Sequence, residues 1–287
     1  MIPFVDFGGE GPLVHFAHAN GFPPNAYRPL VETLRPRYRV MAMCARPLWP
    51  ARPPNGLQDW SPLADDLLQF LDERGIKNVV GVGHSLGGVV TLIAALRRPD
   101  LFRALVMIDP VLLSPAATLA WEAAYRLGLA RWLHPLIPAT LRRQRVFPSA
   151  DAMYASYRRK PAFSRMDDRN LRLCVEALIR PRADGQVELV YPPEWEARIY
   201  LTGPRYERKL WPQLKSLRPP LLVVRGQETD AFMPTAARRM QRQLPGAALR
   251  AIQGAGHLAP LERPQEVGEV IISFLGKLDF SLTPKGL

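Results

Sequence analysis

The sequence predicts an α/β fold with a mostly parallel central sheet flanked by helices. Two observations predict it: short apolar, β-prone runs recur along the chain, and helix-period segments lie between several of them. The alternation of strand-like and helix-like segments stops after residue 110 and resumes near residue 218. We therefore expect residues 1–110 and 218–287 to form the core domain, and residues 111–217 to form a mainly helical insertion, a lid, between the fifth and sixth strands of the parallel part.

The core elements follow from periodicity and from the residues that end each segment. The runs expected to be strands cover residues 4–7, 13–17, 38–44, 78–82, 104–108, 220–224 and 248–252. Helices are expected at 59–74, 86–98, 234–244 and 265–278. Gly75 follows the first of these helices and Pro99 stops the second, as glycine and proline do at helix ends.

The lid, residues 111–217, is expected to be helical at 116–133, 149–159 and 167–179. Asp184-Gly185 indicates a turn between Arg182 and residues 187–191, and so predicts a short hairpin. The lid is also aromatic, through Trp121, Tyr125, Trp132, Phe147, Tyr154, Tyr157, Phe163 and Trp195. Most of these rings are expected to pack the lid onto the core, while a subset lines an apolar acyl pocket.

Composition narrows the class of protein. The 287 residues are 47 % hydrophobic, without the roughly 18 uninterrupted apolar residues that a membrane-spanning helix needs. The N-terminus lacks the pattern of a cleaved secretion signal, and Cys44 and Cys174 have no metal-ligand or C-x-x-C spacing. We expect both cysteines to be buried and reduced, the location to be cytoplasmic, and the protein to be a monomer or homodimer without metal or cofactor.

The net charge of +12 is concentrated in residues 111–217, which hold eighteen Lys and Arg residues against ten Asp and Glu residues. The arginines form no long basic run with interleaved aromatic residues, and no nucleic-acid motif is present, so we expect no nucleic-acid partner. A basic lid does favour an acidic ligand.

Ser85 is the candidate nucleophile. It stands in Gly83-His84-Ser85-Leu86-Gly87, a G-x-S-x-G pentapeptide between an apolar strand and a helix. Such a turn lifts the hydroxyl above the end of the sheet, and the small flanking residues let strand and helix approach closely.

A serine hydroxyl needs an adjacent base to take its proton at neutral pH. Among the five histidines, His257 follows the last predicted strand on a glycine-flanked loop and is the expected base. His84 is expected to pack locally, His15 to lie in the core, and His18 to shape its loop. His134 lies among the lid helices with no partner in view.

The base in turn needs an orienting carboxylate at the end of another strand. Asp230, after the strand at 220–224, is the preferred candidate. Glu228 in the same loop and Asp109 after the strand at 104–108 remain open as alternatives, because sequence alone does not fix how the loop turns.

The oxyanion of an acyl-transfer reaction needs hydrogen-bond donors. The backbone N–H of Leu86, at the start of the helix behind Ser85, is one candidate. The second is expected in the loop led by His18, from the N–H of Asn20, with Gly21 as the alternative.

Together the His18 loop, the Ser85 turn, Asp230, His257 and the lid resemble the α/β-hydrolase family over almost the whole chain. The order Ser–Asp–His matches that family, whereas His18-Ala19 replaces its usual His-Gly pair. A serine nucleophile implies an acyl-enzyme and disfavours the haloalkane dehalogenase and epoxide hydrolase branches, which use aspartate.

The resemblance implies a lid-bearing serine hydrolase acting on a small-molecule acyl substrate, most simply a carboxylic ester. The same triad also serves C–C bond hydrolases, thioesterases, amidases and cofactor-free perhydrolases. A non-catalytic ligand-binding protein on this fold is the third class.

Overall fold

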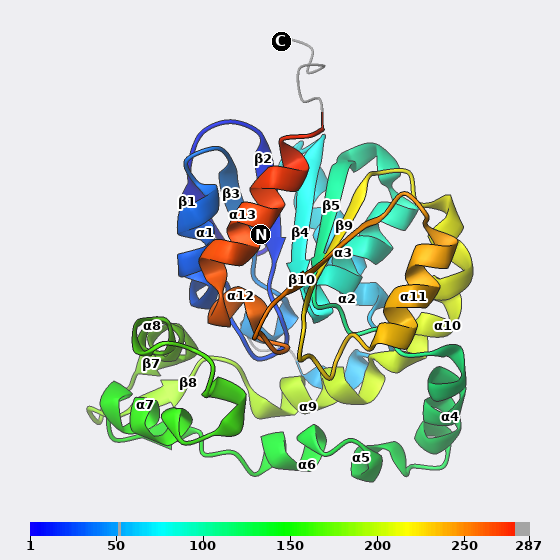
Figure 1. The fold of residues 1–287 in the computed structure, drawn as a ribbon. Coiled ribbons are helices and arrows are strands. Elements are labelled where there is room, and N and C mark those ends of the chain that lie inside the picture. The colour runs from blue at the N-terminus through cyan, green and yellow to red at the C-terminus, as the bar shows by residue number, and fades with distance from the viewer. Residues whose placement is uncertain (51–52, 279–287) are drawn as a thin grey trace.

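A seven-stranded sheet forms the centre of the structure, a computed structural model that describes residues 1–50 and 53–278 (Figure 1). Its strands are β1 (Phe4–Gly8), β2 (Leu13–Ala17), β3 (Arg39–Met43), β4 (Val79–His84), β5 (Phe102–Ile108), β9 (Leu221–Gly226) and β10 (Ala248–Ile252). They lie in the order β1-β3-β2-β4-β5-β9-β10. Only β1 is antiparallel to its neighbour in this sheet. The expected α/β class with a mostly parallel sheet is confirmed.

The central strands are nearly continuous apolar runs because helices cover both of their faces. Every residue of β4 is buried, and so are all but one of β5. The core helices are α1 (Arg28–Leu34), α2 (Ser61–Glu73), α3 (Leu86–Arg97), α11 (Pro234–Gln243), α12 (Ala259–Glu262) and α13 (Pro264–Leu275). Figure 1 shows α1 and α13 side by side, and they share one buried cluster, whereas α2, α3 and α11 contribute to a second cluster.

Residues 111–217, called the lid segment from here on, leave the sheet after β5 and return at β9. The segment contains α4 (Pro115–Arg126), α5 (Ala130–Leu133), α6 (Leu136–Leu141), α7 (Ala150–Arg158), α8 (Asp168–Leu178), α9 (Pro193–Thr202) and α10 (Pro204–Gln213). It also contains a small antiparallel sheet of β6 (Val146–Phe147), β8 (Val187–Leu189) and β7 (Ile179–Pro181). Figure 1 shows α4 to α9 extending along one end of the molecule, below the central sheet.

The expected core elements agree with the structure to within a few residues at each end. The hairpin around Asp184-Gly185 is present as β7 and β8. Two differences have local causes. The sequence did not single out α1, which has only seven residues. The single helix expected at 116–133 is divided into α4 and α5, because Gly128 between them has a φ of 72°, which no helix residue can adopt.

Both cysteines are unpaired. Cys174 is buried as expected, whereas Cys44, also expected to be buried, is only partly so. No helix among the described residues is long and apolar enough to cross a membrane.

Candidate active site

Ser85 lies on a sharp turn between β4 and α3. Its backbone has φ 54° and ψ −118°, a sparsely populated conformation that costs on the order of 1–3 kcal/mol. The glycines around it leave no room for side chains: a Cβ on Gly83 would lie 2.4 Å from the carbonyl carbon of Gly87, and one on Gly87 would lie 2.1 Å from the Ala17 oxygen. The predicted turn is therefore present, and its glycines are required by close backbone contacts.

His257 reaches Ser85 from the loop after β10. Its Nε2 lies 3.0 Å from the Ser85 Oγ, and its Nδ1 lies 2.6 Å from the Oδ2 of Asp109. With the proton on Nδ1, the ring donates to Asp109 and leaves Nε2 free to accept the serine proton. Gly226, at the end of β9, lets this loop approach, since a Cβ there would lie 2.1 Å from the Gly256 oxygen.

The carboxylate that contacts His257 is Asp109. The sequence favoured Asp230 for this position, so that expectation is corrected. Asp109 directly follows β5 and has a φ of 42°, and its side chain is fully buried. Besides His257, it accepts hydrogen bonds from the Gly226 N–H at 3.0 Å and from the Thr229 hydroxyl at 2.5 Å. These donors compensate the desolvation of a buried carboxylate.

The loop after β9 explains why Asp230 is displaced from this role. Thr229 turns inward to donate to Asp109, and the next residue, Asp230, is consequently exposed on the wall of the cavity above Ser85. The third candidate, Glu228, forms an ion pair with Arg165 instead. The one sequence feature that could have indicated Asp109 as the partner of His257 is its position directly after a fully apolar strand.

The two expected oxyanion residues, Leu86 and Asn20, line the same cavity as Ser85. No acceptor for either backbone N–H occurs within residues 1–50 and 53–278. The Asn20 side chain is bound elsewhere, because its NH₂ group donates to the Glu196 carbonyl of α9 at 3.0 Å and its oxygen accepts from the Tyr191 hydroxyl at 3.0 Å. The loop that carries Asn20 is thus fixed to the lid segment.

A buried hydrogen-bond chain links the loop of Ala19 and Asn20 to His257, and sequence reasoning missed it. The Ala19 N–H donates to the Tyr27 hydroxyl at 3.2 Å, and that hydroxyl donates to the Nδ1 of His84 at 2.8 Å. The Nε2–H of His84 then donates to the His257 carbonyl at 2.8 Å. Desolvation lowers the pKa of His84 well below its usual value, so the ring is neutral and can both accept and donate. Tyr27 carries no motif and is brought here only by the fold.

His18 shapes its loop, as expected. Its Nδ1–H donates to the Ala19 carbonyl at 2.9 Å, and its Nε2 accepts the Ala45 N–H at 3.0 Å. Burial lowers the pKa of His18 to about 4, so it is neutral and has no free nitrogen with which to act as a base.

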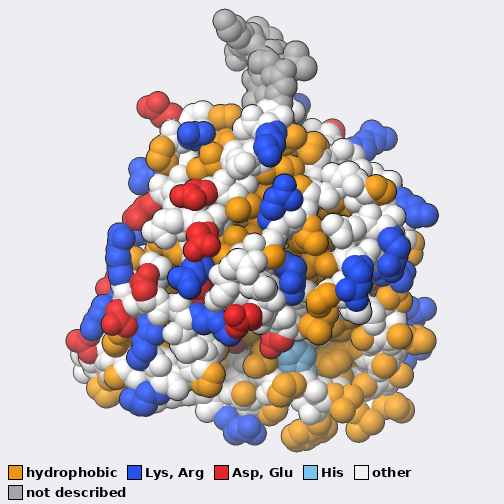
Figure 2. Space-filling model, viewed as in Figure 1, with side chains coloured by type: hydrophobic (Ala, Val, Ile, Leu, Met, Phe, Trp, Pro, Cys, Tyr) orange, Lys and Arg blue, Asp and Glu red, His pale blue; other side chains and the backbone are white. Residues whose placement is uncertain are grey.

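A cavity of about 480 Å³ lies above Ser85, between the core and the lid segment. Its core side includes Ala19, Asn20, Phe22, Trp60, Ser85, Leu86, Asp230, Ala231, His257 and Leu258, and its lid side includes Val111, Leu113, Trp121, His134, Pro135, Leu136, Ile199, Tyr200 and Pro204. The wall is mostly apolar, without Lys or Arg, and Asp230 is the acidic residue on it. Figure 2 shows a hollow with a histidine ring at this junction, surrounded by hydrophobic side chains.

Of the lid aromatics named from the sequence, Trp121 lines this cavity. Four of the eight, Phe147, Tyr157, Phe163 and Trp195, are buried in clusters that include core residues, whereas Trp132 is exposed; this is half of the set and not most of it. Tyr200, which sequence reasoning did not name, also lines the cavity and stacks on His134, with ring centroids 5.1 Å apart.

The buried side chain of Glu207 fixes the backbone of Leu113, which lines the cavity. The Oε2 of Glu207 accepts the Leu113 N–H at 2.6 Å, and the Trp211 indole donates to the Leu113 carbonyl at 2.9 Å. Burial raises the pKa of Glu207 well above its usual value, which favours the neutral form.

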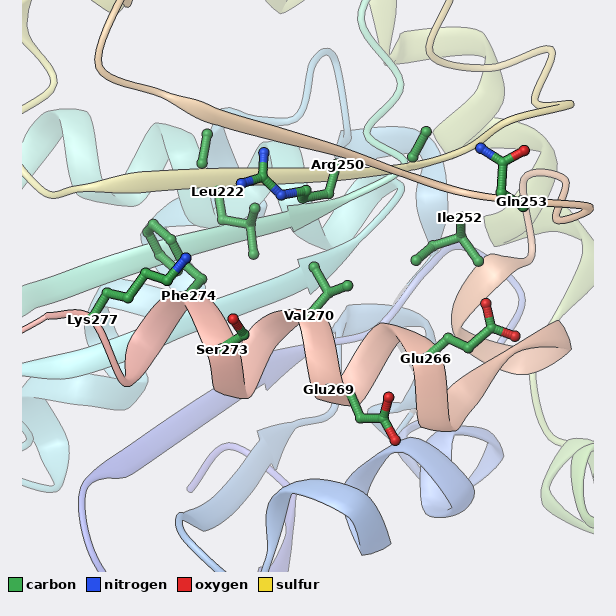
Figure 3. A pocket seen from close by; sticks show the side chains of 12 residues that line it. Leu222, Arg250, Ile252, Gln253, Glu266, Glu269, Val270, Ser273, Phe274 and Lys277 are labelled. Atoms are coloured by element: carbon green, nitrogen blue, oxygen red, sulfur yellow. The ribbon is translucent and has the colours of Figure 1, made fainter.

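A second groove, of about 500 Å³, lies between the edge strand β10 and α13 (Figure 3). Its polar lining combines Arg250 and Lys277 with Glu266 and Glu269, and none of Ser85, Asp109 and His257 contributes to it. Within the described residues, no cluster of three His, Cys, Asp or Glu side chains could hold a metal ion.

The profile of the "Alpha/beta hydrolase family" matches residues 16–270. The chain belongs to this family. As an alpha/beta hydrolase it is 25 % identical to the "Uncharacterized hydrolase YugF" of Bacillus subtilis, over 95 % of this chain and 98 % of that protein. It is 24 % identical to a 2-(acetamidomethylene)succinate hydrolase of Mesorhizobium japonicum, over 93 % of this chain and 89 % of the relative. These relatives and the family support hydrolase activity.

Solved structures agree on the fold. The crystal structure of E-2-(acetamidomethylene)succinate hydrolase superposes with a TM-score of 0.76 at 23 % identity, covering 96 % of this chain and 99 % of that one. A thioesterase domain from the curacin biosynthetic pathway superposes with a TM-score of 0.73 at 17 % identity, covering 94 % of each chain.

Proposed function

We propose that this alpha/beta hydrolase cleaves carboxylic esters through an acyl-enzyme on Ser85. The observation that carries the proposal is the hydrogen-bonded series from the Ser85 hydroxyl through His257 to the buried Asp109, with spacings of 3.0 Å and 2.6 Å. A serine, a base within hydrogen-bond reach and a carboxylate that orients the base are the parts that nucleophilic acyl transfer requires.

In the acylation step, the Ser85 oxygen attacks the ester carbonyl carbon while its proton passes to Nε2 of His257. Asp109 stabilises the resulting imidazolium and keeps it oriented. The N–H groups of Leu86 and Asn20 hold the oxyanion, and the tetrahedral intermediate then expels the alcohol, which takes the proton from His257.

Deacylation repeats these steps with water. His257 removes a proton from the water as its oxygen attacks the acyl carbon, and then returns that proton to the Ser85 oxygen as the acid leaves. No net redox change occurs, and no cofactor enters this scheme.

The cavity supports a neutral substrate with an apolar acyl group. Its lining is mostly aromatic and aliphatic, and the lid arginines that suggested an acidic substrate are absent from it. Several of them form ion pairs with lid carboxylates, such as Arg143 with Glu196 and Arg205 with Glu122. The exposed carboxylate of Asp230 would repel an anionic substrate. A dicarboxylate such as 2-(acetamidomethylene)succinate, named for the Mesorhizobium japonicum relative, would therefore meet no Lys or Arg side chain on the cavity wall.

We propose that residues 111–217 act as the lid over a core of residues 1–110 and 218–287, because both sides supply walls of the cavity. The C–C hydrolase, thioesterase, amidase and perhydrolase alternatives share the triad and differ in the bond cleaved. A non-catalytic ligand-binding role is disfavoured by the intact spacing of Ser85, His257 and Asp109.

The test is the hydrolysis of p-nitrophenyl esters of graded acyl length by the wild-type protein and by Ser85→Ala. We expect turnover of neutral esters and its loss in the variant, with unchanged far-UV circular dichroism. A fluorophosphonate probe should label wild type and not the variant. Equal hydrolysis by both proteins would refute the nucleophile, and thioester or C–C substrates turned over faster than every ester would favour the alternatives.

A further inference from the structure

The lid segment carries a concentrated apolar surface. Ten large hydrophobic side chains are exposed among the described residues, and seven of them lie between residues 119 and 141. This set, the α4–α6 patch, consists of Leu119, Leu127, Leu129, Trp132, Leu133, Leu136 and Leu141. The side chains of Leu127, Trp132 and Leu133 are 72 %, 66 % and 63 % exposed. Single exposed hydrophobic residues are ordinary, but such a concentration marks an interaction surface.

The patch is not needed to hold its own helices in place. Other residues of the same segment provide the packed side, including the buried Ala124, Ala130 and Ile137. The segment therefore has apolar residues both inward and outward. Figure 2 shows hydrophobic side chains gathered along the end of the molecule where α4, α5 and α6 lie in Figure 1.

The patch is continuous with the cavity above Ser85. Leu136 is 48 % exposed and also lines the cavity, and its neighbours His134 and Pro135 line the cavity as well. An apolar surface thus runs from the outside of the lid segment to the chamber that holds the nucleophile. A protein bound over this surface would cover its junction with the cavity, whereas a lipid layer would place apolar chains directly at that junction.

Basic side chains accompany the patch. Arg131 lies over the Trp132 ring at 4.8 Å from its centroid, and neither Arg131 nor Arg142 has an ion-pair partner among the described residues. The acidic residue in this stretch, Glu122, is paired with Arg126 and Arg205. Tryptophan, leucine and unpaired arginine are the residue types that an interfacial, membrane-surface segment uses, and a net charge of +12 favours anionic headgroups.

We propose that the α4–α6 patch docks the protein on the surface of an anionic lipid layer, with Trp132 and its neighbouring leucines inserted at the headgroup–acyl boundary. Docking itself does not depend on catalysis. That the same surface admits acyl substrates from the lipid to Ser85 rests on the proposed ester hydrolysis.

The test measures co-sedimentation of the full chain with vesicles of phosphatidylcholine alone or with about 30 % phosphatidylglycerol. The patch variant is Trp132→Ser/Leu133→Ser, whose positions do not line the cavity. The control is Phe4→Ser, which removes a partly exposed ring that packs on Phe70 and Arg74 from β1, at the opposite edge of the sheet from β10. Ser85→Ala is included to separate binding from hydrolysis.

We expect wild type, Phe4→Ser and Ser85→Ala to bind the anionic vesicles alike, and binding to weaken as salt rises. The patch variant should bind at least about tenfold more weakly, because insertion of two apolar side chains is lost. It should still hydrolyse soluble p-nitrophenyl acetate at the wild-type rate if the proposed function holds. Loss of hydrolysis in every protein, with vesicle binding retained, would refute the catalytic proposal and leave this one standing.

Three results would overturn the docking proposal. One is the absence of wild-type binding to either vesicle, and another is equal binding by wild type and the patch variant. The third is a concentration-dependent dimer in analytical ultracentrifugation that the patch variant abolishes, without vesicle binding; this would make the patch an interface between two copies of the chain.

Discussion

Replacing Asp109 with Asn changes one atom of the side chain but reverses part of its hydrogen bonding. The buried carboxylate accepts from Gly226 on Oδ1 and from both Thr229 and His257 on Oδ2. If the Asn carbonyl keeps the Gly226 N–H, its NH₂ group faces His257 Nδ1. The ring then accepts at Nδ1 and carries its proton on Nε2, where it points at Ser85 and cannot remove the hydroxyl proton.

The expected loss in kcat is about 10⁴-fold, the effect of the wrong tautomer in a serine triad, and this corresponds to about 5.5 kcal/mol of transition-state stabilisation. Asp230→Asn is the matched control, because it makes the same chemical change on the cavity wall. Asp230 has no hydrogen bond or ion pair to another described residue, so we expect kcat to stay within about threefold for a neutral ester.

The assay is steady-state hydrolysis of a neutral p-nitrophenyl ester by both variants, with thermal unfolding measured in parallel. Unfolding data are needed because the Asn NH₂ group replaces the oxygen that accepts from the Thr229 hydroxyl, so that hydroxyl loses its acceptor and stability falls as well. The assignment of Asp109 would be refuted if Asp230→Asn lowered kcat by about 10⁴-fold while a folded Asp109→Asn kept kcat within about tenfold of wild type.

The remaining predictions concern the supports of the site. Tyr27→Phe breaks the chain between the oxyanion loop and His84, and should lower kcat by about tenfold with little change in KM for a neutral ester; equal changes in both would contradict a positioning role. Gly87→Ala places a Cβ 2.1 Å from a carbonyl oxygen of β2, so we expect a lower melting temperature and a loss of at least about 100-fold in kcat/KM, measured against wild type. Acid should destabilise the fold. Burial lowers the pKa of His15 to about 3, of His18 to about 4, and of His84 well below 6.5. Between these values and pH 6.5, the three rings therefore take up protons only when the protein unfolds. Their stabilisation is complete above pH 6.5 and is lost as the pH falls below that value, by up to about 4 kcal/mol per pH unit for three groups; an unchanged urea midpoint between about pH 7.5 and 5.5 would contradict this.

The sequence was most informative where structure is determined locally. The Ser85 turn could be predicted because the spacing of its glycines and the strand and helix around it all lie close together in the chain. His257 was found for a similar reason, on a glycine-flanked loop after a strand. Both side chains meet as expected, with 3.0 Å between Nε2 and the hydroxyl oxygen.

The choice of acid depended on geometry that no local pattern contains. Asp109 and Asp230 both follow parallel strands that are neighbours in the sheet, so either could lie near His257. The decision rests on the turn at Thr229, whose hydroxyl binds Asp109 and thereby directs Asp230 outward. Tyr27 was missed because its partners lie 8 and 57 residues away along the chain.

The lid segment was predicted in outline and not in detail. Its helical content and its hairpin were visible, whereas the break at Gly128 and the helices after residue 190 were not identified. The basic surplus suggested an acidic ligand, but several of the arginines involved form ion pairs within the lid and none lines the cavity. Net charge reports on the surface as a whole and cannot indicate which charges reach a cavity.

The two hydrogen bonds of the Asn20 side chain make the oxyanion loop an indicator of lid position. Its amide group binds the backbone of α9 through Glu196, and its oxygen is bound by Tyr191, so both of these restraints come from residues 111–217. If residues 111–217 were to move away from the core, Asn20 would lose both restraints together, and its backbone N–H, the proposed oxyanion donor, would lose its fixed orientation. The proposed nucleophile Ser85 and the proposed base His257 both lie in core loops, outside residues 111–217. An open molecule would therefore be able to form the attacking oxygen but not to stabilise the charge that the attack creates, and idle hydrolysis would be suppressed until the chamber closes.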